Sequence, residues 1–201
     1  MKKSLLLGIL GLAATAGTGF GQGFISLDNY STYGPLVTYW AGVPANGVSG
    51  ALGAGGLNSS WTAGLYYAIG SLAISDPPGW EMPNAALSLA TGPGSTAQFQ
   101  STTFGVAGEF QSPFAFDTGA SPGPVTVEVV VYPTSAGSYA AALYRAHSFP
   151  FVLTSASISL PATPVGSSMG AFGVTRIPEP TTLALAGLGG LSLWLLRRKH
   201  S

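Results

Sequence analysis

The end of the chain limits which residues can form a water-soluble domain. Residues 181–196 contain no charged side chain and seven leucines. Each central leucine favours membrane insertion by roughly 0.3–0.6 kcal/mol, and a helix of this length spans ~24 Å, less than the hydrocarbon core of a bilayer. Arg197, Arg198 and Lys199 follow directly and should stay on the cytoplasmic side. The sequence therefore predicts a short C-terminal transmembrane helix, with everything before Pro178 outside the cytoplasm.

A proline-rich triplet, Pro178-Glu179-Pro180, stands immediately before this apolar segment. Together with the apolar helix and the basic terminus, it resembles the PEP-CTERM sorting signal of exosortase substrates in Gram-negative bacteria. The resemblance covers residues 176–201. It implies an exosortase as a partner and transient or permanent anchoring in the inner membrane, followed by a place at the cell surface or outside the cell. The alternative is an ordinary anchor with the same topology but no processing, whose prolines only limit the helix.

The first residues of the chain are typical of an export signal. Lys2 and Lys3 precede an apolar run over residues 5–14, and small residues continue to Gly21. This run is too short to span a membrane by itself, and its flanks match a cleaved signal peptide. Cleavage after Gly21 would make Gln22 the first mature residue, and cleavage after residue 16 is the alternative. The predicted organisation is a signal peptide over 1–21, an exported domain over 22–175 and a sorting tail over 176–201.

Composition excludes several classes of function for the exported domain. The chain has no cysteine, which excludes disulfides, thiolate metal sites and cysteine nucleophiles. Five of its seven basic residues lie in the two targeting ends. The segment before the triplet keeps two basic residues against six acidic ones, a net charge of −4. Such a surface offers no basic footprint for nucleic acid. About 155 residues remain, enough for one domain.

Short runs of Val, Thr, Tyr and Phe, separated by Gly and Pro, predict a mainly β domain. We expect a single β-sandwich or jelly-roll-like fold of about eight strands. The expected strands cover residues 23–29, 36–40, 62–69, 86–90, 97–104, 114–116, 125–132 and 149–158. Alternation is clearest in Val125–Val129, where the valines should face a core and Thr126 and Glu128 should face outward.

Three further segments complete the predicted architecture. Residues 42–60 contain many glycines and predict a long flexible loop. Residues 138–147 have high helix propensity and a capping serine, so one short helix is expected there, with a strand as the alternative. Residues 163–175 are rich in Gly, Ser and Pro and are interpreted as a stalk, with room for a last strand at 171–175.

The inventory of catalytic side chains is small. His147 is the one histidine of the exported domain, and no nucleophile elbow accompanies it. We interpret it as a surface side chain at a helix end. With no cysteine and no second histidine, a zinc site is not expected. Asp28 and Asn29 are too sparse for a calcium loop, although calcium on carboxylates stays open.

Two further features suggest carbohydrate chemistry. Glu109 and Glu128 could form a glycosidase pair if folding brought them within roughly 5–10 Å, but Glu128 is interpreted as a solvated charge on a strand. Trp80 ends the turn Asp76-Pro77-Pro78-Gly79 and could stack on a sugar ring. The alternative, which we favour, is that Trp80 closes one end of the core.

The sequence thus predicts an exported surface protein without enzymatic activity, cofactor or bound metal. The resemblance of the tail implies a structural or adhesive component of an exopolysaccharide or biofilm matrix. The alternative function is a carbohydrate-binding module that uses Trp80, and a glycoside hydrolase is a distant third. Polysaccharide is a candidate partner, and nucleic acid is not.

Overall fold

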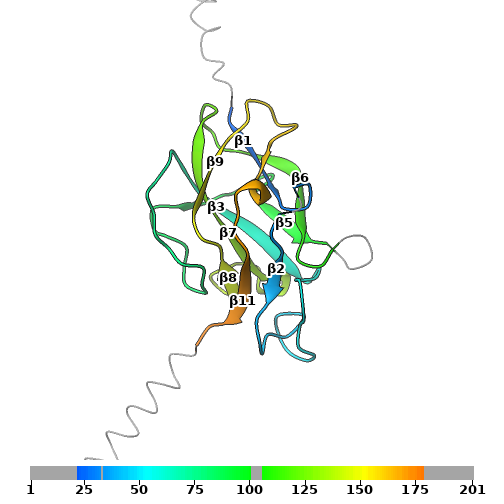
Figure 1. Ribbon diagram of the computed structural model, residues 1–201. Helices are drawn as coiled ribbons and strands as arrows, with labels where there is room; N and C mark the ends of the chain where they lie inside the picture. Colours follow the sequence, from blue (N-terminus) through cyan, green and yellow to red (C-terminus); the bar gives the residue numbers. More distant parts are fainter. Residues whose placement is uncertain (1–21, 33, 101–105, 179–201) are drawn as a thin grey trace, which may run out of the picture.

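The computed structural model describes residues 22–32, 34–100 and 106–178 (Figure 1). Strand accounts for 41% of the structure and helix for 4%, which confirms the mainly β prediction. The strands are β1 (Phe24–Asp28), β2 (Val37–Tyr39), β3 (Trp61–Ile69), β4 (Ser88–Leu89), β5 (Thr96–Phe99), β6 (Phe110–Asp117), β7 (Pro124–Pro133), β8 (Tyr144–His147), β9 (Phe151–Thr154), β10 (Thr163–Pro164) and β11 (Phe172–Arg176). Two 3₁₀ turns, η2 (Thr134–Ala136) and η3 (Val165–Ser167), complete the described elements.

The strands form one connected sheet in the order β10-β1-β6-β5-β3-β7-β8-β11-β2, with β4 on β3 and β9 on β7. The sheet curls, so that the amide of Val37 in β2 donates to the carbonyl of Gly108 just before β6, at 3.2 Å. Figure 1 shows this arrangement, with the long antiparallel pair β3 and β7 at the centre. The curled sheet does not confirm the predicted sandwich or jelly roll.

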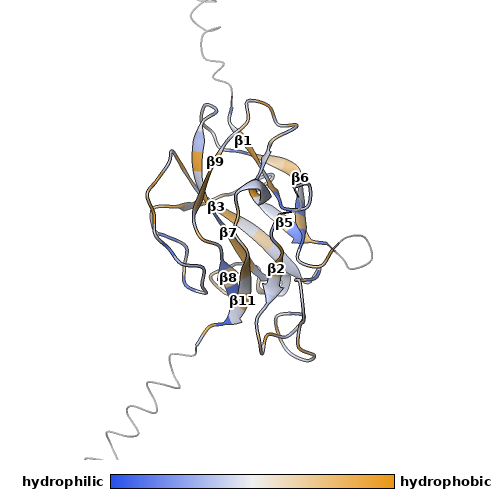
Figure 2. Cartoon of the chain, viewed as in Figure 1, coloured by the Kyte–Doolittle hydropathy of each residue, from blue (hydrophilic) through white to orange (hydrophobic). Residues whose placement is uncertain are grey.

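The core lies inside the curl and is apolar. Its largest members, among them Trp61, Phe99 and Phe110, are at most 2% exposed. Val125, Val127 and Val129 belong to the same cluster, which confirms the predicted inward valines of β7. Figure 2 shows orange, hydrophobic stretches on several strands, among them β1, β6 and β7. Since burial of a side chain of this size contributes about 1.5–3 kcal/mol, these residues carry much of the stability of the fold.

The opposite face of β7 is also buried, contrary to prediction. Thr126 is 1% exposed and Glu128 is fully buried. Residues 70–87 pass over this face, and we call them the covering loop. Thr126 Oγ1 holds the start of this loop, since it donates to the carbonyl of Gly70 and accepts from the amide of Leu72. The alternation of β7 is therefore real, but its second face meets the covering loop instead of water.

The predicted helix over residues 138–147 is wrong, and the strand alternative holds for its second half. Tyr144–His147 form β8, which pairs with β7 and with β11. All four residues of β8 are buried. A short isolated helix is marginal in water, so pairing on both edges overrides local propensity here.

Two glycine-rich segments are better integrated than the sequence suggested. In the loop over residues 42–60, Val43 is 1% exposed and Leu57 is fully buried. The carbonyl of Ala45 in the same loop accepts hydrogen bonds from Trp61 Nε1 at 3.0 Å and from the Tyr39 hydroxyl at 2.8 Å. Residues 163–175, interpreted as a stalk, pack into the domain, since the expected last strand is β11 and lies between β8 and β2.

Among the helices that the structure describes, none has the length and hydropathy to cross a membrane. The predicted signal peptide over 1–21 lies outside the described residues, as do Glu179, Pro180 and the whole apolar segment with Arg197, Arg198 and Lys199.

Candidate functional site

A carboxylate and an imidazole meet beneath the covering loop. Glu128 lies in the middle of β7 and His147 ends β8, and both side chains are fully buried. His147 and Val130 are register partners, so their side chains lie on the same face of the sheet. Glu128 is two residues before Val130 on β7 and therefore lies on that face too. His147 Nδ1 lies 3.6 Å from Glu128 Oε2. The interpretation of His147 as a surface residue and of Glu128 as a solvated charge is therefore wrong, because both face the covering loop.

A hydrogen bond of the His147 ring shows which of its two nitrogens carries a proton and which has a free lone pair. Nδ1 lies 3.0 Å from the carbonyl oxygen of Ser148, which can only accept. We therefore assign the proton to Nδ1, which leaves a lone pair on Nε2. Within the described residues, Nε2 is buried without a hydrogen-bond partner, and so is Glu128 Oε1. Two buried polar atoms without partners in one cluster are unusual, because each costs about 1–3 kcal/mol.

Burial changes the acid–base behaviour of Glu128. Desolvation raises the pKa of its carboxyl to about 7, the nearby negative charge of Asp76 adds to this rise, and the amide of Asn84 opposes it. That amide donates to Glu128 Oε2 at 3.4 Å. A carboxyl with a pKa near neutrality in a buried cluster is typical of sites with a function beyond packing.

Asp76 of the covering loop completes the cluster. It is half-buried, and one ligand atom each from Asp76, Glu128 and His147 lie within 4.8 Å of one another. Zinc was not expected from the sequence because the exported domain has one histidine and no cysteine. The passage of a loop that brings a carboxylate over a buried strand is a tertiary feature. A signal was present: Val125 to Val131 is a nearly continuous β-branched run, a pattern typical of a strand buried on both faces.

Arg145 fixes the covering loop to β8. Its Nε donates to the carbonyl of Trp80 at 2.7 Å, and its Nη1 donates to the carbonyls of Tyr139 and Ala140. The guanidinium also lies over the Tyr139 ring, 4.8 Å from its centroid. The amide of His147 donates to the carbonyl of Gly79 at 2.8 Å. These bonds place Trp80, which follows Gly79, and Asp76, three residues before Gly79, beside the end of β8.

The other carboxylates singled out from the sequence have local structural roles. Asp28 Oδ1 accepts from the amides of Tyr30 and Ser31, and Asn29 bonds the backbone of Phe110 and of two loop residues. Glu109 Oε2 accepts from the amide of Val106 at 3.1 Å, within its own turn. The structure does not bring Glu109 to Glu128, since β5 and β3 lie between β6 and β7.

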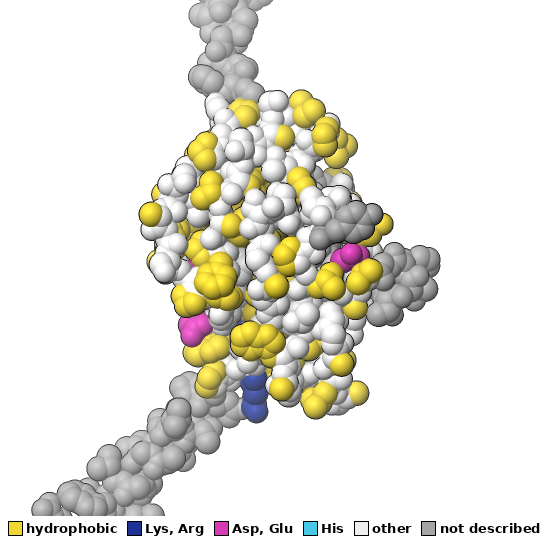
Figure 3. Space-filling model, viewed as in Figure 1, with side chains coloured by type: hydrophobic (Ala, Val, Ile, Leu, Met, Phe, Trp, Pro, Cys, Tyr) yellow, Lys and Arg dark blue, Asp and Glu magenta, His cyan; other side chains and the backbone are white. Residues whose placement is uncertain are grey.

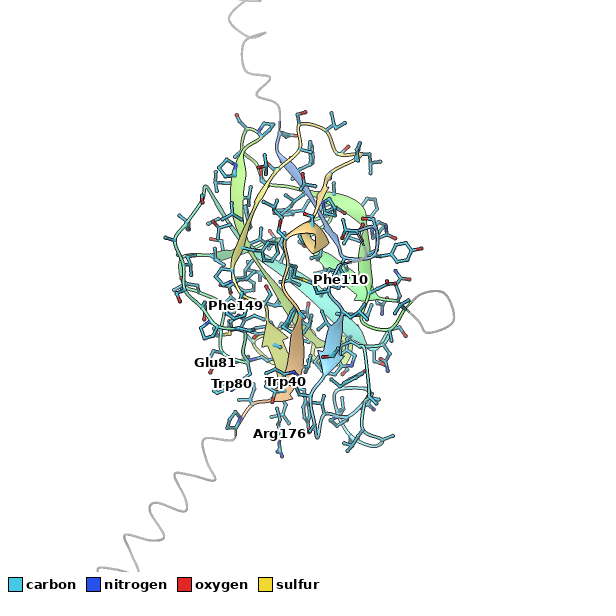
Figure 4. All side chains as sticks on the ribbon, in the orientation of Figure 1. Trp40, Trp80, Glu81, Phe110, Phe149 and Arg176 are labelled. Atoms are coloured by element: carbon cyan, nitrogen blue, oxygen red, sulfur yellow. The ribbon has the colours of Figure 1, made fainter. Side chains whose placement is uncertain are left out.

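Three aromatic side chains form what we call the aromatic face: Trp40, Trp80 and Phe149. Trp40 is 50% and Phe149 51% exposed, and Trp80 is half-buried. Figure 4 labels all three in one view, Trp40 and Trp80 near the ends of β2, β8 and β11 and Phe149 beside the connection from β8 to β9. Figure 3, in the same view, shows hydrophobic side chains at the surface among polar ones. Trp80 is half-buried and does not belong to the core cluster, so the favoured role of closing one end of the core is wrong. The stacking of Trp80 on a sugar stays a prediction.

The backbone of β11 supports this face. The indole of Trp40 occupies the space where a Cβ of Gly173 would stand, so it lies directly against β11. The amide of Trp40 also donates to the carbonyl of Val174 at 3.1 Å. Trp80 is held by Arg145, the register partner of Thr175 on β11. Trp80 is therefore held at the β8 edge of β11, and Trp40 lies at its β2 edge. Neighbouring strands are ~4.8 Å apart.

A separate cleft of about 390 Å³ lies between β1, β6 and residues 159–164. Its wall includes Phe114, which is 62% exposed, and Gln111. The remaining lining is mostly serine, alanine and proline. It contains no histidine, and its one acidic residue, Asp28, is already bonded by the amides of Tyr30 and Ser31.

The described chain leaves the domain at the end of β11. The amide of Ile177 donates to the carbonyl of Leu143 at 2.9 Å, and Pro178 is exposed. From Arg176 onward, residues 176–199 match the family model of the PEP-CTERM protein-sorting motif. The chain carries a PEP-CTERM sorting motif. This motif implies export, an anchored C-terminal region before processing, and processing by an exosortase. No curated protein and no solved structure matches the chain.

The PEP-CTERM motif covers only the tail, so the exported domain must be interpreted from its own side chains. The structure connects the two parts directly, because Arg176 is both the last residue of β11 and the first residue of the motif. No flexible spacer separates the sheet from the start of the sorting segment.

Proposed function

We propose that this chain is an exosortase-sorted, non-enzymatic matrix protein that attaches to polysaccharide through the aromatic face. The observation that carries the proposal is the placement of Trp40, Trp80 and Phe149 on one side of a rigid sheet, in a chain whose tail is a sorting motif. Aromatic rings combine a large apolar surface with low conformational freedom. Flat rings of this kind suit the apolar faces of sugar rings.

The charge of the surface supports a neutral partner. Before the tail, the exported domain has seven charged residues in all. Figure 3 shows only isolated acidic and basic groups on the visible side, and Figure 4 labels Glu81 and Arg176 there. A strongly charged ligand would need a larger field of one sign. A polysaccharide rich in hydroxyl groups fits a surface of aromatic, serine, threonine and amide side chains.

A hydrolase is disfavoured because a substrate could not reach the side chains best suited to catalysis. Glu128 and His147, the pair with the most suitable chemistry, are both fully buried. A polymer substrate would have to displace the covering loop and its bonds from Arg145 to reach them. We therefore keep binding and adhesion, and not turnover, as the proposed activity.

The test measures binding of the full chain in detergent to a panel of insoluble polysaccharides, including exopolysaccharide from an exosortase-bearing host. Trp40→Ala and Phe149→Ala should each weaken binding by about 3- to 10-fold, the loss expected for one stacked aromatic side chain. Phe114→Ala, an exposed aromatic in the separate cleft, is the matched control and should bind normally.

Three outcomes would contradict the proposal. The chain could fail to bind any member of the panel, or the two aromatic-face variants could bind as well as the original. Loss of binding in Phe114→Ala alone would assign the sugar site to the cleft beside β6 and remove the aromatic face from the function.

A further inference from the structure

We propose that Asp76, Glu128 and His147 bind one divalent transition-metal ion, and that Zn²⁺ is the ion their donor set fits best. The three ligand atoms lie within 4.8 Å of one another. This inference is independent of polysaccharide binding, because it concerns the buried cluster beneath the covering loop and not the aromatic face.

Two possible metal-binding atoms of the cluster are buried without hydrogen-bond partners. His147 Nε2 and Glu128 Oε1 are buried and have no hydrogen-bond partner among the described residues. His147 Nδ1 is already committed to the carbonyl of Ser148. A histidine that binds a metal through one nitrogen commonly donates from the other to a carbonyl or carboxylate, which fixes the ring and its tautomer. The lone pair of Nε2 is therefore in the state that a metal ion requires.

The charges of the cluster also favour a cation. Two carboxylates, from Asp76 and Glu128, meet there, and Glu128 is fully buried. A dication compensates both negative charges in place. Asp76, Glu128 and a neutral His147 together supply two negative charges, so the occupied site is neutral.

The distances between the ligand atoms and the types of ligand favour zinc over calcium and magnesium. Zinc–ligand distances of about 2.0–2.2 Å place tetrahedral ligand atoms ~3.4 Å apart. Ligand atoms up to 4.8 Å apart must therefore approach one another by at most ~1.4 Å, and Asp76 can move most easily because it is half-buried in a loop. Calcium prefers six to eight oxygen ligands, and magnesium prefers oxygen and water. One nitrogen and two oxygens from three residues, with a water as the fourth ligand, suit zinc better.

A bound ion would join the covering loop to the sheet. Glu128 and His147 belong to neighbouring strands, whereas Asp76 belongs to the loop that runs over them. The ion would add to the attachments that Arg145, the amide of His147 and Thr126 Oγ1 already make to this loop. Its role would be structural, since both sheet ligands are closed off from solvent.

The test uses the full chain, purified in detergent, stripped with a chelator and titrated with Zn²⁺. We expect about one zinc per chain by elemental analysis, together with a rise in Tm that the chelator reverses. Asp76→Asn and His147→Gln should each weaken zinc binding at least tenfold. Glu81→Gln, an exposed carboxylate of the same loop, is the matched control and should bind zinc like the original.

Further variants separate this site from other zinc sites and from misfolding. His200→Gln should leave the stoichiometry unchanged, whereas loss of zinc in that variant would assign the ion to the tail and overturn the proposal. Asp76→Asn alters a half-buried loop residue, so it should fold even if His147→Gln does not. Unchanged zinc affinity in folded Asp76→Asn, or no saturable zinc in the folded original chain, would also overturn it.

Discussion

Glu128 is the residue at which burial and charge conflict most in this domain. It sits in the longest strand, between the valines of the core, yet its carboxyl faces a second buried surface. Desolvation and the neighbouring Asp76 raise the pKa of Glu128 to about 7. Tyr66 lies opposite it on β3 and His147 lies beside it on β8. Without a bound cation, the protonated form is the one that this environment favours.

We predict that, in the presence of a chelator, the free energy of unfolding of the original chain depends more on pH than that of Glu128→Gln. The pKa of Glu128 in the fold lies above its unfolded value, so its contribution is complete below about pH 4.5 and is lost as the pH rises toward 7. Glu128→Gln cannot ionise. Relative to the original chain, this variant should gain on the order of 1–3 kcal/mol between those pH values. Denaturant unfolding across pH 4–8 measures the difference.

Glu109→Gln serves as the comparison, because the Glu109 carboxylate accepts a hydrogen bond within its own turn, from the amide of Val106. Parallel pH profiles for the original chain and Glu128→Gln would show that Glu128 ionises in the fold as easily as in the unfolded chain.

At the scale of elements, β11 is the strand on which several features depend. It pairs antiparallel with β8 and parallel with β2, and its Gly173 leaves room for the Trp40 indole. Any side chain at this position would collide with that ring. The glycine therefore connects the pairing of two strands with the orientation of one exposed aromatic.

We predict that Gly173→Ala displaces Trp40 and lowers the free energy of unfolding by about 1–3 kcal/mol, the usual cost of overpacking. Gly170→Ala is the matched control, because no atom lies within 4 Å of the Cβ position of that glycine. Denaturant unfolding gives the free energies, and tryptophan fluorescence reports the indole environment. Equal stability and equal emission in the two variants would mean that Trp40 does not rest on β11.

The elements that the sequence predicted correctly are those whose pattern depends on local chemistry. Alternating valines located β7. The helix over residues 138–147 failed because pairing with β7 on one edge and β11 on the other outweighs the propensity of an alanine-rich stretch. The buried cluster could not be found for the same reason. Its members are separated by 52 and 19 positions, and only the passage of the covering loop brings Asp76 to Glu128 and His147.

At the scale of the whole molecule, the sorting motif and the domain share a residue. The motif begins at Arg176, where β11 ends, and the amide of Ile177 is still bonded to Leu143. Recognition of the triplet therefore has to take place close to the folded domain. The tail itself could be recognised from sequence because its signal is composition and order, which need no tertiary contacts.

We predict that replacing Pro178, Glu179 and Pro180 together by alanine blocks processing without blocking insertion. The two prolines keep the backbone extended, while the leucines and the basic terminus that direct insertion stay unchanged. Fractionation of an exosortase-bearing host should show the full-length variant retained in the inner membrane. Replacement of Arg197, Arg198 and Lys199 by serine is the comparison and should disturb orientation. Normal processing of the triple-alanine tail would leave residues 176–199 as a simple anchor.

The position of β11 inside the sheet determines how the domain would respond to mechanical load. A chain attached at its C-terminal side and bound to a matrix is pulled along β11, because that strand leads directly into the tail. Its hydrogen bonds to β8 and to β2 lie across the direction of pull, so they are loaded in shear and share the force. The first strand, β1, likewise has a neighbour on each edge, β6 and β10. Both terminal strands are thus internal, and tension must break two ladders together before either end of the domain can peel away.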